Sequence, residues 1–224
     1  MTLCRPVGIV PVVKKGEKGM SSRPSSRERI LDTAEDVVLK EGATHMTLDA
    51  VASKAGVSKG GLIYHFPSQR DLLQAMVKRF AGNMKACKAK FRATLPASPV
   101  REIKASILAW FTLGDEYRRA ATALLAAVIR DPKLLDDVRK ERLKTMAGIL
   151  NASPSPDRVT ILLLAMEGIW MSELLGISNF TKSARNQIKR TLLQLADEWF
   201  RPPATSVPQK CPRRQKNMSD SVSK

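Results

Sequence analysis

Aromatic residues and histidines are scarce in this sequence, and the shortage narrows its fold class. Aromatic side chains make up 5% of the 224 residues, and only two histidines are present. Aromatic and β-branched residues are enriched in β-strands, whereas Leu and Ala recur here at helical spacing. We therefore expect an all-α protein, long enough for one large domain or for a small domain joined to a medium-sized one.

Cysteines and long apolar runs are also few. Cys4, Cys87 and Cys211 are odd in number, far apart and without Cys-x-x-Cys or His-x-Cys spacing, which argues against a disulfide framework and a zinc site. No apolar run approaches the roughly 20 residues of a membrane-spanning helix. Pro6 and Pro11 interrupt the apolar N-terminal stretch, so we expect no signal peptide, no membrane partner and a cytoplasmic location.

Common catalytic motifs are absent from the sequence. It contains no P-loop, no Gly-x-Gly-x-x-Gly after a strand, no Gly-x-Ser-x-Gly and no His-Glu-x-x-His, and neither histidine stands near a plausible nucleophile. These absences predict that the chain is not an enzyme. We expect no cofactor and no metal.

Acidic residues are outnumbered by basic ones. There are 38 Lys and Arg against 21 Asp and Glu, a formal net charge of +17. Residues 1–29 carry seven basic residues against two acidic ones, and residues 201–224 carry six against one. Most of the excess therefore lies near the ends of the chain. A basic balance favours nucleic acid or an anionic membrane surface as a partner, without choosing between them.

Composition divides the chain into four segments. Residues 1–24 and 202–224 are basic and rich in Pro and Ser, and we expect both to be disordered. Met20 opens a second plausible start; our hypothesis that it is the true start is tested by N-terminal sequencing of the native protein. Between the tails we expect a small helical domain at 25–70 and a larger one at 71–201.

Helix signals are regular in the small domain. Ser25 and Glu28 have the spacing of a capping box, and an apolar face follows until Gly42. Two short helices are then predicted in the run TLDAVASKAGVSKGGLIYHFPSQRDLLQAM, which spans residues 47–76. A tight turn at Gly56 joins them, and Ala52 is small enough to let the helices cross closely. The spacing is that of a helix-turn-helix, although other helical hairpins share it.

The same run resembles the DNA-binding domain of the TetR (tetracycline-repressor) family over about residues 25–75. The segment GVSKG followed by Tyr-His-Phe carries the resemblance most specifically. It implies that the second short helix enters the major groove of DNA. The sequence departs from the family at Gly61, where Thr is frequent, at Ile63, where an aromatic residue is frequent, and at Gln69, where a phosphate-binding Lys is frequent.

The resemblance implies a set of DNA contacts. Lys59 is the side chain able to donate to guanine O6 and N7, Ile63 suits thymine methyl groups, and the helix start at Thr47 suits a phosphate. The full predicted set is Thr47, Ser58, Lys59, Gly61, Ile63, Tyr64, His65 and Gln69. His65 is alternatively a packed residue at a helix end, and Tyr64 alternatively part of the core. The basic face of the following helix, from Lys78 to Arg92, is most simply a solvated surface.

The larger domain is helical throughout by its periodicity. Helices are predicted to begin near Pro99, at Asp115, at Asp131 and at Ser155, and a last one is predicted from about Thr181 to Phe200. Its last two helices have apolar residues on more than one face. The family resemblance implies that they form a homodimer, through residues 156–175 and 182–200. Two-fold symmetry then requires a near-palindromic operator.

The resemblance also implies a pocket for an unidentified small-molecule effector. By residue type, a bulky apolar cation would suit the candidates, although ordinary core packing explains each one alone. They are Trp110, Phe111, Met146, Met166, Glu167 and Trp170. The expected function is a sequence-specific DNA-binding repressor that its effector releases from the operator. The alternative is a protein that binds nucleic acid or membrane surfaces through charge alone.

Overall fold

The computed structural model describes residues 25–43, 45–178 and 180–200, and these are helical with no strand, which confirms the predicted all-α class. The predicted disordered tails, with Met20, Cys4 and Cys211, lie outside the described residues. The helices are α1 (Ser26–Glu41), α2 (Leu48–Ala55), α3 (Lys59–His65), α4 (Gln69–Thr94), α5 (Arg101–Thr112), α6 (Asp115–Arg130), the 3-10 helix η1 (Pro132–Leu135), α7 (Asp136–Asn151), α8 (Pro156–Leu174) and α9 (Lys182–Trp199).

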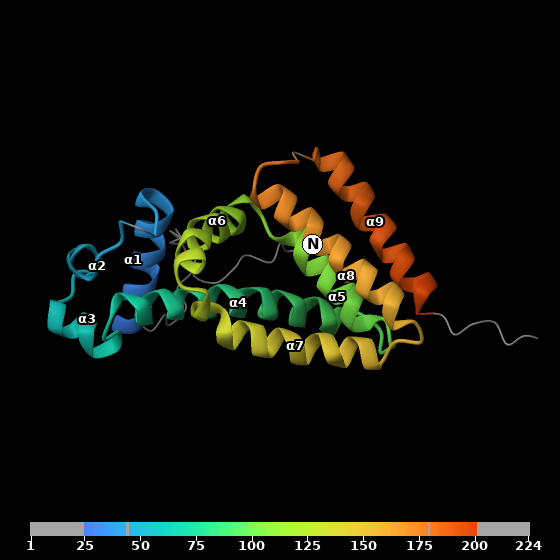
Figure 1. Cartoon of the computed structure of the whole chain (residues 1–224), viewed down its shortest axis with the longest axis horizontal. Coiled ribbons are helices and arrows are strands. Elements are labelled where there is room, and N and C mark those ends of the chain that lie inside the picture. The colour runs from blue at the N-terminus through green and yellow to red at the C-terminus, as the bar shows by residue number, and fades with distance from the viewer. Residues whose placement is uncertain (1–24, 44, 179, 201–224) are drawn as a thin grey trace, which may run out of the picture.

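The helices form a small head joined to a larger body by α4 (Figure 1). Helices α1, α2 and α3 make the head at one end. The long helix α4 runs from the head along the body, packing against α5, and α9 packs on both α5 and α8. Helix α6 contacts both α1 and α4, and η1 contacts α4, so the head touches the body through more than one segment.

The core of the head continues into the body. Ile30, Val51, Leu62 and Leu72 are fully buried there, and Leu124 of α6 belongs to the same apolar cluster. Each large apolar side chain fully removed from water contributes about 1.5–3 kcal/mol. Because α4 begins at Gln69 and carries this core onward, the predicted boundary at residue 70 falls near the start of a continuous helix.

Side-chain caps set several helix starts as predicted. The hydroxyl oxygens of Ser25, Thr47 and Ser58 each accept a hydrogen bond from the backbone N–H three residues later, at 3.0–3.2 Å. Gly56 ends α2 with φ of 65°, in the left-handed region that favours glycine. At Asp131 the chain first forms η1, and α7 begins only at Asp136, because the Asp131 carboxylate accepts from the Lys133 N–H and closes a tighter turn.

Helix α8 buries one face and exposes another apolar face. Val159, Leu162 and Met166 are buried in the body, against α5 and α9 among others. Ile161, Leu164, Met171 and Leu175 are 46–59% exposed. Such a stripe is unusual for a helix at the surface of a monomer. Within the part of the chain described, no helix is both long and apolar enough to cross a membrane.

Candidate nucleic-acid interface

Helix α3 is held to the head by its inner face. Leu62 is fully buried and Phe66, just after the helix, is 2% exposed. The turn is fixed by a hydrogen bond from the Val57 N–H to the Ala52 carbonyl, at 3.1 Å. The residues one position before and after Leu62, Gly61 and Ile63, are exposed. The anchor therefore sets which side chains α3 can present to a ligand.

The outer face of α3 is nearly flat at its start and apolar at its end. Lys59, Gly60 and Gly61 are exposed, and neither glycine has a side chain to hold a partner away. Ile63 is 39% exposed and Tyr64 is 84% exposed. The exposure of Tyr64 argues against its alternative placement in the core. An exposed isoleucine and tyrosine on one short helix are suited to contacts with another molecule.

His65 lies beside this face. Its residue is half-buried, and its ring packs edge-on against Tyr64 with centroids 5.1 Å apart. The ring centroid of Phe66 is 6.5 Å from that of His65. These contacts place His65 at the edge of the outer face, where both of its predicted roles, packing and DNA contact, can be met together.

The polar groups at the helix starts also act as caps. Thr47 accepts from the Ala50 N–H, and Ser58 accepts from the Gly61 N–H, in each case through the side-chain oxygen. A hydroxyl that accepts in this way still has its own hydrogen to donate. Thr47 and Ser58 can therefore order their helices and donate to a phosphate at the same time.

Lys59 has a partner that sequence reasoning missed. Its ammonium lies 3.0 Å from a carboxylate oxygen of Asp49, at the start of α2. Both side chains are well exposed, at 63% and 69%, so the pair adds at most about 1 kcal/mol to stability. Ten residues separate the two in sequence, and only the crossing of α2 and α3 brings them together. Asp49 therefore competes with any acceptor that approaches Lys59.

Gln69 is tied to the head rather than fully free. Its side-chain amide donates to the Met46 carbonyl at 2.6 Å, while Met46 itself is fully buried. Met46 immediately precedes Thr47. The bond therefore fixes the segment that sets the position of the Thr47 hydroxyl, a positioning contact that sequence reasoning did not foresee.

The basic face of α4 is partly neutralised. Lys85 lies 2.6 Å from Glu141 of α7, and Lys88 lies 3.3 Å from Glu102 of α5. Arg79 pairs with acidic residues of α1. These partners show that much of the face joins helices within the chain.

Four of the six effector candidates belong to one apolar cluster of the body, and the other two, Trp170 and Glu167, lie outside it. Met166 is buried, and Trp110 packs edge-on against Trp170 with ring centroids 4.8 Å apart. The Arg185 guanidinium lies 5.5 Å from the ring centroid of Phe111. Met146 is partly buried in the same apolar cluster as Met166. Glu167 pairs with Arg142 of α7 at the surface. Among the described residues, no group of three or more His, Cys, Asp or Glu is placed to hold a metal ion.

Two family profiles match this arrangement. The profile of bacterial regulatory proteins of the tetR family matches residues 30–76, which include α2, α3 and most of α1. The tetracyclin repressor-like C-terminal domain profile matches residues 100–197, from α5 into α9. The chain belongs to the TetR family. The resemblance found in the sequence is thereby confirmed, and the body is placed in the family as well.

Curated relatives match this chain over different lengths. The HTH-type transcriptional regulator SrpR of Pseudomonas putida is 37% identical over 60 residues, or 27% of this chain and 28% of the relative. The match to TtgW, from a strain of the same species, spans 45% of that relative. The chain thus matches less than half the length of these relatives. The HTH-type transcriptional repressor KstR of Mycobacterium tuberculosis is 26% identical over 197 residues, covering 83% of this chain and 86% of the relative.

Solved structures share the whole fold. A TetR-family regulator structure from Rhodococcus sp. has a TM-score of 0.60 at 20% identity, covering 79% of this chain and 99% of that chain. The multidrug binding protein EbrR complexed with imidazole has a TM-score of 0.59 at 24% identity, covering 82% and 99%. At this level of identity the likeness supports the fold of head and body.

Proposed function

We propose that this TetR-family chain is a sequence-specific DNA-binding repressor that acts as a homodimer and leaves its operator when a small molecule binds. The observation that carries the proposal is the outer face of α3, where Ile63 and Tyr64 are exposed on a helix anchored by Leu62. Relatives named as repressors, such as BepR of Brucella suis, which is 39% identical over 54 residues, support the direction of regulation.

In the proposed complex, α3 recognises DNA bases through close approach of its backbone and through apolar side-chain contact. With no side chain at Gly60 and Gly61, the start of α3 can approach base edges closely. Ile63 then contacts thymine methyl groups, and Lys59 donates to guanine after leaving Asp49. Thr47, Ser58, Tyr64, His65 and Gln69 complete the contact surface, chiefly toward phosphates, which position the head without reading sequence.

The exposed stripe of α8 supports the homodimer. Ile161, Leu164, Met171 and Leu175 recur at the spacing of an interhelical seam, and the small Ala165 and Gly168 are exposed between them. A second copy of α8 related by two-fold symmetry presents the same stripe. The outward residues of α9 are polar, so we assign the apolar centre of the interface to α8 and its rim to α9.

Effector binding in the body can reach the head through α6. At one end of α6, Arg118 lies 3.9 Å from Glu173 of α8, and at the other, Asp131 lies 2.6 Å from Arg70 of α4. We propose that an effector near Trp110 and Trp170 shifts α6 and thereby the spacing of the two heads. EbrR has been crystallised with ethidium and with malachite green, which supports an aromatic effector without identifying it.

Fluorescence anisotropy on the upstream intergenic DNA tests the proposal. We expect the chain to bind that duplex at least about 100-fold more tightly than a scrambled duplex of equal composition at physiological salt. Equal affinities that fall together as salt rises would instead support binding by charge alone. A third duplex with deoxyuridine in place of thymine tests Ile63: unchanged affinity would exclude methyl contacts.

The substitution Asp49→Asn should strengthen DNA binding. It removes a negative charge close to the phosphates and frees Lys59, so we expect about three- to tenfold tighter binding at low salt. The salt dependence should steepen by up to about one counterion. Weaker binding by the variant would show that Asp49 positions Lys59 for contact. Asp36→Asn on α1, a like charge change away from α3, serves as the control.

A further inference from the structure

A chain of aromatic rings joins α4 to the body across α6. The ring of Tyr117 on α6 stacks on the ring of Phe80 on α4, with centroids 4.0 Å apart and planes inclined by 17°. The Tyr117 ring also lies 5.7 Å from that of Trp170 on α8, which in turn lies 4.8 Å from Trp110 on α5. Rings whose centroids lie within about 7 Å of each other interact. Four helices therefore meet ring against ring.

The same rings join three apolar clusters. Phe80 packs against the apolar cluster of the head and also against the cluster that contains Tyr117. Trp170 packs against the Tyr117 cluster, and Trp110 packs against the apolar cluster of the body. Because protein interiors are closely packed, the displacement of one ring has to be accommodated by the next. The rings thus connect head and body in addition to the ion pairs of α6.

Tyr117 is the most deeply buried member of this chain of rings. It is 2% exposed, whereas Phe80, Trp110 and Trp170 are half-buried. Its hydroxyl donates to the backbone carbonyl of Phe80 at 3.3 Å, and burial raises the pKa of Tyr117, so the hydroxyl keeps its proton. The bond is longer than the roughly 2.7–2.8 Å usual between two oxygens. The stack on Phe80, more than this hydrogen bond, therefore ties α6 to α4.

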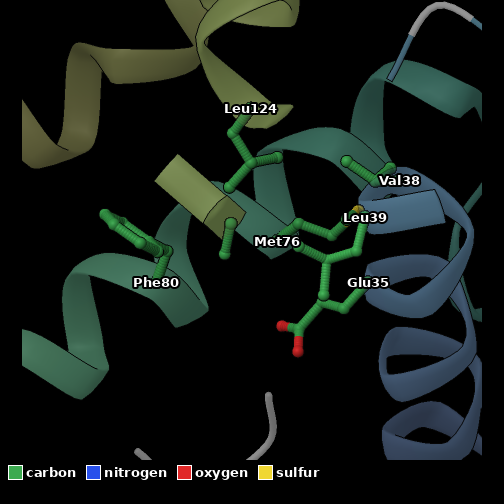
Figure 2. Close-up of a pocket in the computed structure, with 7 residues that line it drawn as sticks. Glu35, Val38, Leu39, Met76, Phe80 and Leu124 are labelled. Carbon is green, nitrogen blue, oxygen red and sulfur yellow. The ribbon is translucent and has the colours of Figure 1, made fainter. Parts of the chain in front are cut away.

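Phe80 also borders a small gap where α1, α4 and α6 meet. Figure 2 shows Phe80 at one side of this gap and Val38 of α1 at the other. Once open solvent is left out, the gap has room for about one water molecule. It is too small for an organic ligand, but it leaves the Phe80 ring room to shift slightly. Phe80 can therefore follow a movement of Tyr117 rather than block it.

The two tryptophans stand where the effector is proposed to act. We propose that Tyr117 is a positioning residue that passes a displacement of Trp170 on to Phe80, and so to the head. An effector that moves Trp170 would move Tyr117, and the stack would carry the movement into α4, which follows α3 in the chain. Coupling is reciprocal, so DNA bound at the head must also alter the surroundings of the tryptophans. This role rests on the proposed effector release, whereas the mechanical coupling of the rings does not.

Urea unfolding of the full chain, at one protein concentration, tests the coupling without DNA or effector. Phe80→Leu and Trp170→Leu are made singly and together. We expect the pair to depart from additivity by at least about fivefold in the unfolding equilibrium constant, and by less than about twofold when every member also carries Tyr117→Leu. A control cycle replaces Phe80→Leu with Phe200→Leu, at a ring of the body cluster outside this chain of rings, and should be additive.

Tryptophan fluorescence gives a readout that a purely structural role would not move. In a Trp199→Phe background the remaining tryptophans are Trp110 and Trp170. We expect their emission to change as the upstream intergenic duplex binds, with the midpoint that anisotropy gives. Tyr117→Leu should lose at least about two thirds of this change while binding the duplex within about threefold of the background chain. Tyr117→Phe keeps the stack and should retain most of the change.

The two measurements separate the role of Tyr117 from the proposed repressor function. Additive effects of Phe80→Leu and Trp170→Leu, or an emission change that survives in Tyr117→Leu, would overturn the role of Tyr117. Duplex binding with no emission change in the Trp199→Phe chain would overturn it as well. Failure to bind the upstream duplex would count against the repressor alone, because the unfolding cycles still decide the coupling.

Discussion

Replacing Leu164 with glutamate should convert the protein to monomers and reduce operator affinity at least about 100-fold. Leu164 is 58% exposed at the middle of the α8 stripe. In the proposed dimer the new carboxylates would face each other across the two-fold axis, buried and without partners. Each monomer would keep one head, so it would hold one half-site and lose the gain from binding two together.

Leu143→Glu on α7 is the matched control for this prediction. Leu143 is 62% exposed, so the same change is made at a leucine of similar exposure outside the α8 stripe. Sedimentation velocity reports the assembly state and fluorescence anisotropy the affinity. A Leu164→Glu protein that remains dimeric would show that the interface lies elsewhere. Loss of the dimer in Leu143→Glu alone would move it to α7.

The helix-turn-helix could be predicted because its signals are local. The caps at Thr47 and Ser58 and the left-handed glycine at Gly56 are each encoded within a few residues, and the structure has them. The number and approximate starts of the body helices followed for the same reason. The exception is α7. It begins only after η1, because the side chain of Asp131 accepts a hydrogen bond from the Lys133 N–H and holds a short 3-10 turn there.

The contacts that the sequence did not reveal join segments far apart in the chain. Asp49 and Lys59 meet across two helices, and Gln69 reaches Met46 from the start of α4. The effector residues were chosen by type, and type cannot show that Glu167 meets Arg142. Their assignment to a pocket therefore stays a prediction. For α8, the sequence predicts apolar residues on more than one face. Which of these faces is exposed follows only from the packing of the body, which buries Val159, Leu162 and Met166.

Glu35 is the clearest case of a residue whose surroundings depend on segments far away in the chain. On α1 it lies between the apolar Ala34 and the acidic Asp36, and it has the appearance of a solvated residue. Arg79, far along the chain on α4, and the approach of α6 make it buried. The consequence is energetic. Burial, more than the opposing effect of Arg79, raises the pKa of Glu35 from its ordinary 4.5 to about 8.

The substitution Glu35→Gln should therefore stabilise the fold, increasingly so as pH rises. In the unfolded chain Glu35 ionises near its ordinary pKa of 4.5, whereas in the folded chain it holds its proton until about pH 8. Folding thus binds a proton between these values, and the stability of the native chain falls as pH rises through them. Glutamine cannot ionise, so the variant escapes this loss. Above pH 8 we expect a gain of up to about 5 kcal/mol.

Urea unfolding from pH 5 to pH 9 measures this effect, at one fixed protein concentration because the proposed dimer would be linked to folding. The difference in unfolding free energy between Glu35→Gln and the native chain should be small at pH 5, grow with pH and level off above about 8. Asp137→Asn, at an exposed position on α7 away from the charges that act on Glu35, should run parallel to the native chain. A difference that does not vary with pH would mean that Glu35 is ionised in the fold, with Arg79 rather than burial governing its charge.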